Sequence, residues 1–152
     1  MRSLAQPAAR RELEARIAAL CPTDQRRWGS MTVHQMICHT TEAFRGAMGD
    51  KPMTPAQRLP VPHPLLKFGA LRVPLHWPHG FPSPPEIAQD KQGTPPVEFE
   101  SDRAALLAAL ADFCTRRPHP LPPHPYFGPM SAQDWKRWGY LHTDHHLRQF
   151  AR

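Results

Sequence analysis

Residues 131–152 read SAQDWKRWGYLHTDHHLRQFAR, and the rest of the chain can be understood as completing this segment. The segment contains no proline, and Ser131 is followed three residues later by Asp134. This spacing approaches a capping box, which satisfies free N–H groups at the start of a helix. At about 100° per residue, one face of the predicted helix carries aromatic and imidazole groups, namely Trp135, Trp138, Gly139, His142, His146 and Gln149. The other face is charged, with Arg137, Asp144 and Arg148.

His142 and His146 are four residues apart, so on a helix they lie one above the other on the same face. This is the spacing by which a helix offers two nitrogens to one metal ion. The same spacing also suits histidines that simply face a core or a neighbouring helix. The chain has 10 histidines, so pairs arise by chance, and His142 with His145 is a rival pair. A metal site therefore requires a third ligand from elsewhere in the chain.

The length and charge of the chain limit its class. A chain of 152 residues is expected to form a single domain, covering residues 1–152, with a real core. The formal net charge of +6 permits binding to anions or nucleic acid. The positive charges are scattered in pairs at 10–11, 26–27, 116–117 and 136–137, without a long basic run. A solvated surface is therefore favoured over a specific nucleic-acid interface.

The cysteines and the hydropathy pattern indicate a compartment. Cys21, Cys38 and Cys114 are odd in number and form no CxxC motif, which argues against a disulfide framework and for a reducing environment. The first twenty residues carry charges throughout and have no apolar signal region. No stretch approaches the ~20 apolar residues needed to span a bilayer. We expect a cytoplasmic protein without membrane attachment.

Proline placement separates the predicted helices. All of the 20 prolines except Pro7 and Pro22 lie within residues 52–96 or 118–129. Proline breaks helix interiors, so the proline-free windows predict long helices over residues 8–20, 33–48 and 102–117, in addition to the final segment. Thr32 with Gln35 forms a capping box before the second helix. For the third long helix, the sequence predicts Ser101 as N-cap and Pro118 as the stop.

The remaining stretch, residues 51–101, is a proline-rich connection with room for a short helix over residues 65–73. Its large apolar side chains are expected to cover an apolar surface or anchor the connection: Leu65, Phe68, Leu71, Leu75, Trp77, Phe81 and Ile87. Packing against the body is thus favoured, although this composition also allows a disordered tether. No useful strand-like alternation occurs. The predicted fold is all-α, a four-helix bundle with a long Pro-rich crossover connection.

Three motifs carry a resemblance to a known family. WGSMT at residues 28–32 leads into the helix containing His39, HPYFGPMS occupies residues 124–131, and the third block runs from Trp135 to Phe150. Over residues 28–150 the chain resembles the DinB-like superfamily of four-helix-bundle proteins and, within it, the branch known as DUF1569. The resemblance implies a bundle with a long crossover and a three-histidine metal centre. The positions that match this centre are His39, His142 and His146.

His39 raises a geometric difficulty for this centre. On the helical wheel it lies at the flank of the apolar face, roughly 60° from Met36, so it is a boundary residue that reaches the interior only between two neighbouring helices. His34 and His145 fall outside the family pattern, and we expect them in solvent or beside the ligands.

The implied centre suggests a chemistry. Three neutral imidazoles suit zinc or nickel and leave one coordination position open, as in catalytic rather than structural sites. By resemblance, the protein is expected to be a metal-dependent thiol-S-transferase, in which a low-molecular-weight thiol bound to the metal attacks an electrophilic small molecule. The alternative is a non-catalytic metal-binding or stress-associated helical bundle. A homodimer is also expected from the resemblance to bundles that pair through helix faces.

Four neighbours of the predicted ligands have alternative roles. Gln149 could hydrogen-bond a ligating ring or make a polar contact between helices. Trp135 and Trp138 could line a pocket, although core packing is the favoured role. Cys38 is expected to be a buried, inert thiol rather than a nucleophile.

Overall fold

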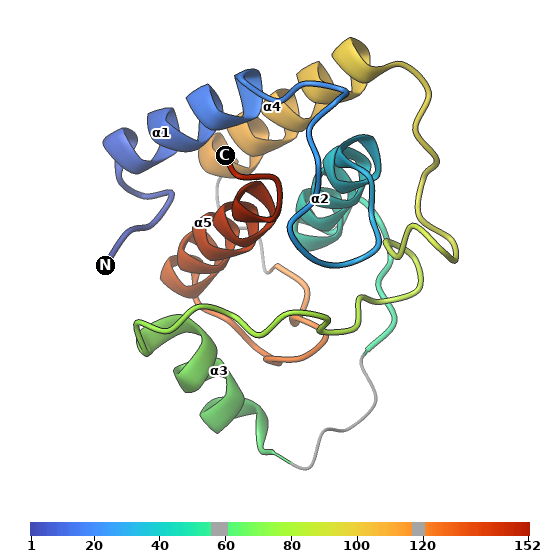
Figure 1. Cartoon of the computed structure of the whole chain (residues 1–152). Helices are drawn as coiled ribbons and strands as arrows, with labels where there is room; N and C mark the ends of the chain where they lie inside the picture. Colours follow the sequence, from blue (N-terminus) through green and yellow to red (C-terminus); the bar gives the residue numbers. More distant parts are fainter. Residues whose placement is uncertain (56–60, 117–120) are drawn as a thin grey trace.

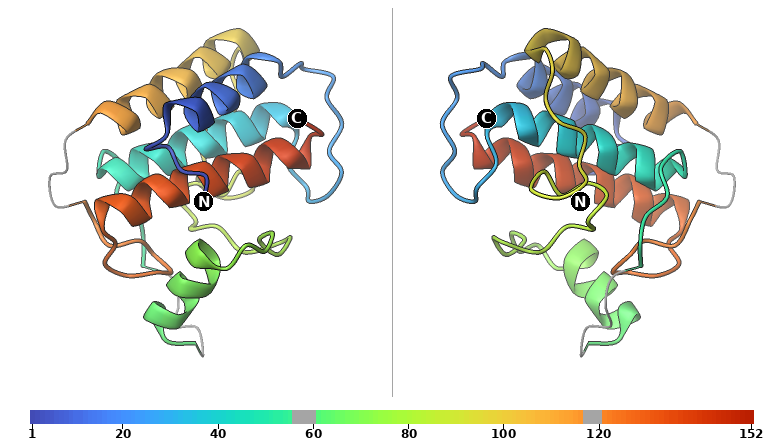
Figure 2. Two further views of the ribbon diagram at one scale, coloured as in Figure 1. Left: turned by 90° about the vertical axis from the view of Figure 1, so that its left-hand side faces the viewer. Right: turned by 90° about the vertical axis from the view of Figure 1, so that its right-hand side faces the viewer.

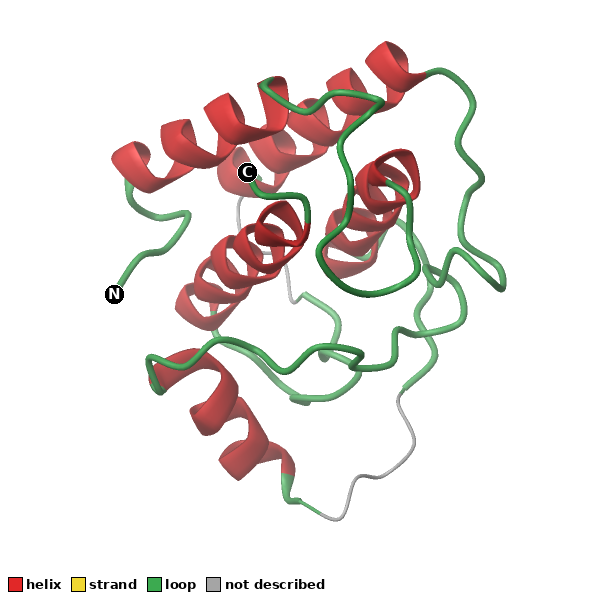
Figure 3. Cartoon of the chain, viewed as in Figure 1, coloured by secondary structure: helices red, strands yellow, loops and turns green. Residues whose placement is uncertain are grey.

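The computed structural model describes residues 1–55, 61–116 and 121–152. Within these ranges the chain forms five helices (Figure 1): α1 (Pro7–Ala18), α2 (Val33–Met48), α3 (His63–Arg72), α4 (Phe99–Thr115) and α5 (Ala132–Gln149). The described residues contain no strand (Figure 3), only an isolated bridge between His124 and Gly128. The prediction of an all-helical fold is confirmed. No described helix is both long and apolar enough to cross a membrane.

The helices α2 and α5 begin where their capping boxes predict. The Thr32 hydroxyl accepts the Gln35 N–H at 3.1 Å, and the Gln35 side chain accepts the Thr32 N–H at 2.9 Å. Ser131 and Asp134 make the same reciprocal pair, with both distances 3.1 Å. Each box satisfies two of the N–H groups that a helix start leaves free. At the other end of α2, Gly49 adopts a left-handed conformation with φ of +82° and ends the helix, as glycine does without steric cost.

The predicted N-cap of the third long helix is wrong. Helix α4 begins at Phe99, and Glu98 rather than Ser101 is its N-cap. The Glu98 carboxylate accepts the N–H groups of Glu100 at 3.1 Å and Ser101 at 2.7 Å. A carboxylate at this position satisfies two free donors and is also favoured by the positive end of the helix dipole. The predicted end of this helix at residues 117–118 lies outside the described residues.

The four longer helices surround the core. Helix α2 packs against α4 and α5, and α1 packs against the same two helices, so these four elements lie side by side (Figure 2). Side chains from all four are almost completely buried between them, including Leu13, Ile17, Ile37, Phe44, Leu106, Leu110 and Leu147. This arrangement leaves one face of α2 and one face of α5 directed toward each other, where the candidate site forms.

Helix α3 stands apart from this core and contacts α5 (Figure 2). Leu71 in its last turn is fully buried, but Leu65, Phe68 and Leu75 remain 65%, 62% and 72% exposed. The prediction that all four cover an apolar surface is therefore wrong for three of them. The reason is that α3 meets α5 near its C-terminal end, where the Leu71 carbonyl accepts a hydrogen bond from Arg137 at 3.2 Å. Leu66 and Ala70 pack partly against the core, whereas the Leu65 and Phe68 side chains are left uncovered.

Beyond α3, part of the long connection between α2 and α4 packs against the helices. Ile87 and Ala88 are buried, and their N–H groups both bond the Pro84 carbonyl at 3.1 Å. Phe81, by contrast, is 46% exposed. Ile87 thus anchors this part of the connection, in addition to Leu71 in α3, whereas Phe81 does not. The Ile87 anchor has a direct consequence for His39.

Candidate metal centre

Three histidines from two helices meet between α2 and α5. His39 comes from α2, and His142 and His146 come from successive turns of α5. One ring nitrogen from each lies within 4.8 Å of the other two. The ring centroids are 5.4 Å apart for His39 and His142, 4.8 Å for His39 and His146, and 4.7 Å for His142 and His146. The structure therefore brings together the three side chains named from the sequence, in a group that could hold a metal ion.

His39 is not the boundary residue that the helical wheel indicates, because the chain connection covers it. Its side chain is only 2% exposed. The ring Nδ1 lies 2.8 Å from the carbonyl oxygen of Ile87, which belongs to the anchored part of the connection. A carbonyl oxygen can only accept, so Nδ1 donates and Nε2 keeps a free electron pair. The connection thus both buries His39 and orients its ring.

Gln149 orients His146 in the same way. The Gln149 amide nitrogen donates to the Trp28 carbonyl at 2.8 Å, so its oxygen is the atom that faces His146. That oxygen lies 3.2 Å from His146 Nδ1, which must therefore donate and leave Nε2 as the acceptor. Of the two roles considered for Gln149, the contact with a ring of the cluster is present, whereas its other contact ties α5 to the loop before α2 rather than to another helix. Such partners of ligating histidines set ring orientation and basicity.

His142 carries an unsatisfied nitrogen. Its Nδ1 is buried and has no hydrogen-bond partner within the described ranges. The Trp138 ring stacks on the imidazole, with centroids 4.9 Å apart and planes inclined by 16°. Leaving a buried polar atom without a partner costs about 1–3 kcal/mol. A bound metal ion could accept the electron pair of such a ring nitrogen. The three imidazole donors and this unpartnered nitrogen are therefore both consistent with a cation at the cluster.

Burial keeps the three rings neutral. Desolvation lowers the pKa of His39, and it lowers the pKa values of His142 and His146 well below the usual value. The neighbouring imidazoles lower the last two pKa values further, because a second positive charge nearby is unfavourable. Neutral imidazole is the form that binds metal. The cluster is therefore in its ligating state at neutral pH without having to release protons.

The cluster lines a large cleft. The cleft has a volume of about 1560 Å³ and is also lined by Trp28, Trp77, Trp138, Leu65 and Leu75, among others. The exposed leucines at and beyond α3 thus form part of its wall. Trp138 is 5% exposed and lines the cleft as well, so it both packs in the core and walls the site. A cleft of this size is ample for a small-molecule ligand.

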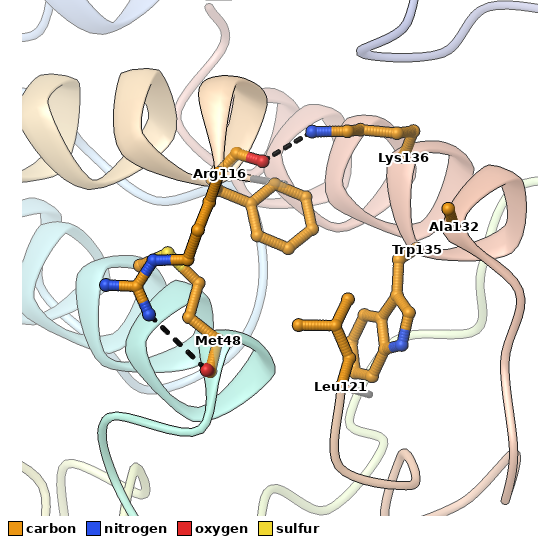
Figure 4. Close-up of a pocket in the computed structure, with 7 residues that line it drawn as sticks. Met48, Arg116, Leu121, Ala132, Trp135 and Lys136 are labelled. Carbon is orange, nitrogen blue, oxygen red and sulfur yellow. Dashed lines mark hydrogen bonds between the residues drawn. The ribbon is translucent and has the colours of Figure 1, made fainter. Parts of the chain in front are cut away.

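A second, much smaller cavity lies between the ends of α2, α4 and α5 (Figure 4). Its volume is about 40 Å³, and among the described residues it shares only Trp135 with the cleft. Arg116 donates to the Met48 carbonyl at 3.5 Å, and Lys136 donates to the Phe113 carbonyl (Figure 4). None of the three clustered histidines lines this cavity. It has room for little more than water and is not a candidate functional site.

The other singled-out residues lie outside the cluster. His145 is directed toward the rings of Trp28 and His79, which stack on each other at 4.1 Å. The rival pair of His142 and His145 is therefore not the pair that forms the cluster. Burial raises the pKa of the Cys38 thiol to about 11, so this residue is not a nucleophile at neutral pH. His79 was missed in the sequence, where it carries no spacing signal.

The His124 side chain, also missed in the sequence, should make stability depend on pH. Burial lowers its pKa to about 3, and its Nδ1 accepts the N–H groups of Tyr126 and Phe127 at 3.1 and 3.3 Å. At a pH between this value and the pKa of about 6.5 in the unfolded chain, His124 is protonated in the unfolded chain but neutral in the folded one. The free energy of unfolding should therefore fall as pH falls below about 6.5, and His124 alone should contribute about 2 kcal/mol of this loss at pH 5.

The variant His124→Asn tests this contribution, because an amide oxygen can accept the same N–H groups but binds no proton. Urea unfolding of chelator-treated protein at pH 7 and pH 5 should show a smaller difference for this variant than for the wild type. The matched control, His76→Asn, removes an exposed histidine and should keep the wild-type difference. An equal pH dependence in all three proteins would contradict the assignment.

Together, the fold and the site define an all-helical protein with a buried cluster of three neutral histidines that could hold a metal ion. Residues 80–152 match the model of a protein family described as Protein of unknown function (DUF1569). The match supports the resemblance to that family, and it includes His142 and His146 but not His39. Comparisons with curated proteins and with solved structures found no match.

Proposed function

We propose that the protein is a metal-dependent enzyme of DinB-like type, in which His39, His142 and His146 hold a divalent zinc or nickel ion. In this proposal α1, α2, α4 and α5 form a four-helix bundle, and the connection between α2 and α4 is its long crossover. The mutual packing of these four helices supports that assignment. The observation that carries the proposal is the convergence of three buried, neutral imidazoles at the wall of a large cleft.

The proposed reaction is transfer of a low-molecular-weight thiol to an electrophilic small molecule. Three protein ligands leave a position open, and a divalent ion supplies Lewis acidity that favours loss of a proton from a bound water or thiol. The chain's own residues hold the ligating rings in place through Ile87 and Gln149. The largely apolar and aromatic wall of the cleft would suit an apolar part of the electrophile. Lys91 also lines the cleft, where its ammonium group could bind a carboxylate of the thiol.

The proposed activity can be tested with protein purified without a histidine tag and reloaded with zinc or nickel. Consumption of cysteine or glutathione in the presence of a haloaromatic electrophile should be faster with the loaded protein than with chelated protein. The variant His39→Ala should lose this difference, whereas Arg26→Ala, which changes an exposed residue that does not line the cleft, should retain it. A protein that binds its ion but consumes no thiol would instead be the non-catalytic metal-binding bundle. Homodimer formation, the absence of specific nucleic-acid binding and a cytoplasmic location stay predictions.

A further inference from the structure

A second group of potential ligands lies on another side of α2. His34 and Cys38 are four residues apart on this helix, and Asp102 lies in the first turns of α4. One donor atom from each of the three residues lies within 4.8 Å of the other two. Cys38 and His39 are consecutive, and consecutive helical side chains diverge by about 100°. The group therefore faces α4, whereas the three-histidine cluster faces α5.

The contacts of this group show a polar centre that is buried at one end and open at the other. His34 Nε2 lies 2.7 Å from Asp102 Oδ2, and the same oxygen accepts the Val97 N–H at 3.0 Å. Cys38 is 5% exposed, while the His34 and Asp102 side chains remain 22% and 25% exposed. An ion could therefore reach the group from solvent past the imidazole and the carboxylate, with the thiol at the base. The prediction that His34 lies free in solvent or beside the three-histidine ligands is wrong, because it bonds across to α4.

Neighbouring groups hold two of these donors in position. The Phe99 ring meets the His34 ring edge-on, with centroids 5.2 Å apart. The Val97 N–H fixes the Asp102 carboxylate just inside the start of α4. Positioned donors lose less freedom on binding than mobile surface side chains do. A hydrogen-bonded pair accounts for His34 and Asp102, whereas a metal ion would engage all three donors, including the thiol that lies within reach of both.

We propose that His34, Cys38 and Asp102 form a second divalent metal site, selective for zinc-like ions and separate from the three-histidine cluster. Imidazole, thiolate and carboxylate are each established zinc donors, and three of them leave one position for water. Binding releases the proton of the Cys38 thiol to solvent, leaves Asp102 as a carboxylate, and requires His34 to be neutral with its proton on Nδ1. The ion would replace the direct contact between His34 and Asp102 and would join α2 to α4.

Cobalt(II) distinguishes the two sites, because only this one offers a thiolate. The experiment uses the tag-free double variant Cys21→Ser/Cys114→Ser, in which Cys38 is the single remaining cysteine. Titration with cobalt should produce a near-ultraviolet thiolate-to-cobalt charge-transfer band, and dialysis followed by elemental analysis should count two ions per chain. Adding His142→Ala should remove one ion and keep the band.

Two further variants test the assigned ligands. Adding Cys38→Ser should abolish the band and remove one ion, while the ion at the three-histidine cluster remains. Adding Asp102→Asn should weaken the band at a given cobalt concentration, because the amide can still accept the bond from His34 but is a poorer ligand. If the double variant binds one ion and shows no thiolate band, the second site is overturned and the three-histidine site stands. A band with only one ion would support the second site and refute the first.

Discussion

Replacing His142 with alanine should lower the metal content by one ion per chain and leave the fold in place. The change removes one of three ligands and leaves a two-ligand site, because no other donor of the cluster can replace it. Loss of a supporting partner alone typically costs about 10–100-fold in metal affinity, so loss of a ligand should cost more. The measurement is elemental analysis of tag-free protein after dialysis, with circular dichroism to confirm the helical content.

The control for this result is His76→Ala, which removes an exposed imidazole and should leave the metal content unchanged. The comparison separates loss of a ligand from loss of any one of the 10 histidines. Equal metal content in His142→Ala and in the wild type would contradict the proposed metal centre. The same outcome would also remove the basis for the proposed thiol transfer.

Replacing Phe44 with alanine should lower the free energy of unfolding by about 3–5 kcal/mol, the range typical for a buried phenylalanine. Phe44 is 1% exposed, and its ring lies 5.1 Å from that of Phe113 and 6.2 Å from that of Trp138. Removing it leaves a cavity in the core directly beside the ring that stacks on His142. The measurement is urea unfolding at neutral pH with chelator present, so that metal binding does not contribute.

The matched control is Phe68→Ala on α3, which removes the same side chain from a position that is 62% exposed. Its effect should stay within about 0.5 kcal/mol, as expected for a surface change. Similar losses of unfolding free energy for the two variants would show that Phe68 is packed far more closely than in this structure. A small loss for Phe44→Ala would show that the core between α2, α4 and α5 is not closed.

The location of the cluster explains why these two predictions are linked. Trp138 belongs to the core through its contacts with Phe44 and Phe113, and it belongs to the site through its stacking on His142. The ring of His142 is thus held by the same packing that stabilises α5 against α2. A site supported in this way is pre-organised, so damage to the core should also weaken metal binding.

Local signals in the sequence were sufficient for α2 and α5. The capping boxes at Thr32 and Ser131 predict both starts, because the donors that they satisfy lie within three residues of the cap. The pairing of His142 with His146 follows from helix geometry in the same way. These features depend only on neighbours along the chain, and a short stretch of sequence therefore contains everything that sets them.

The other features depend on which distant residues become neighbours. The helical wheel places His39 at a flank, but it is the Ile87 carbonyl from the connection that covers and orients the ring. The apolar spacing of residues 65–75 suggests a covered face, yet α3 meets α5 at one end and leaves Phe68 exposed. Hydrophobic spacing records which side chains share a face, whereas burial depends on whether another part of the chain arrives to cover it. Local backbone geometry is thus encoded in short stretches of sequence, while the environment of each site residue follows from long-range packing.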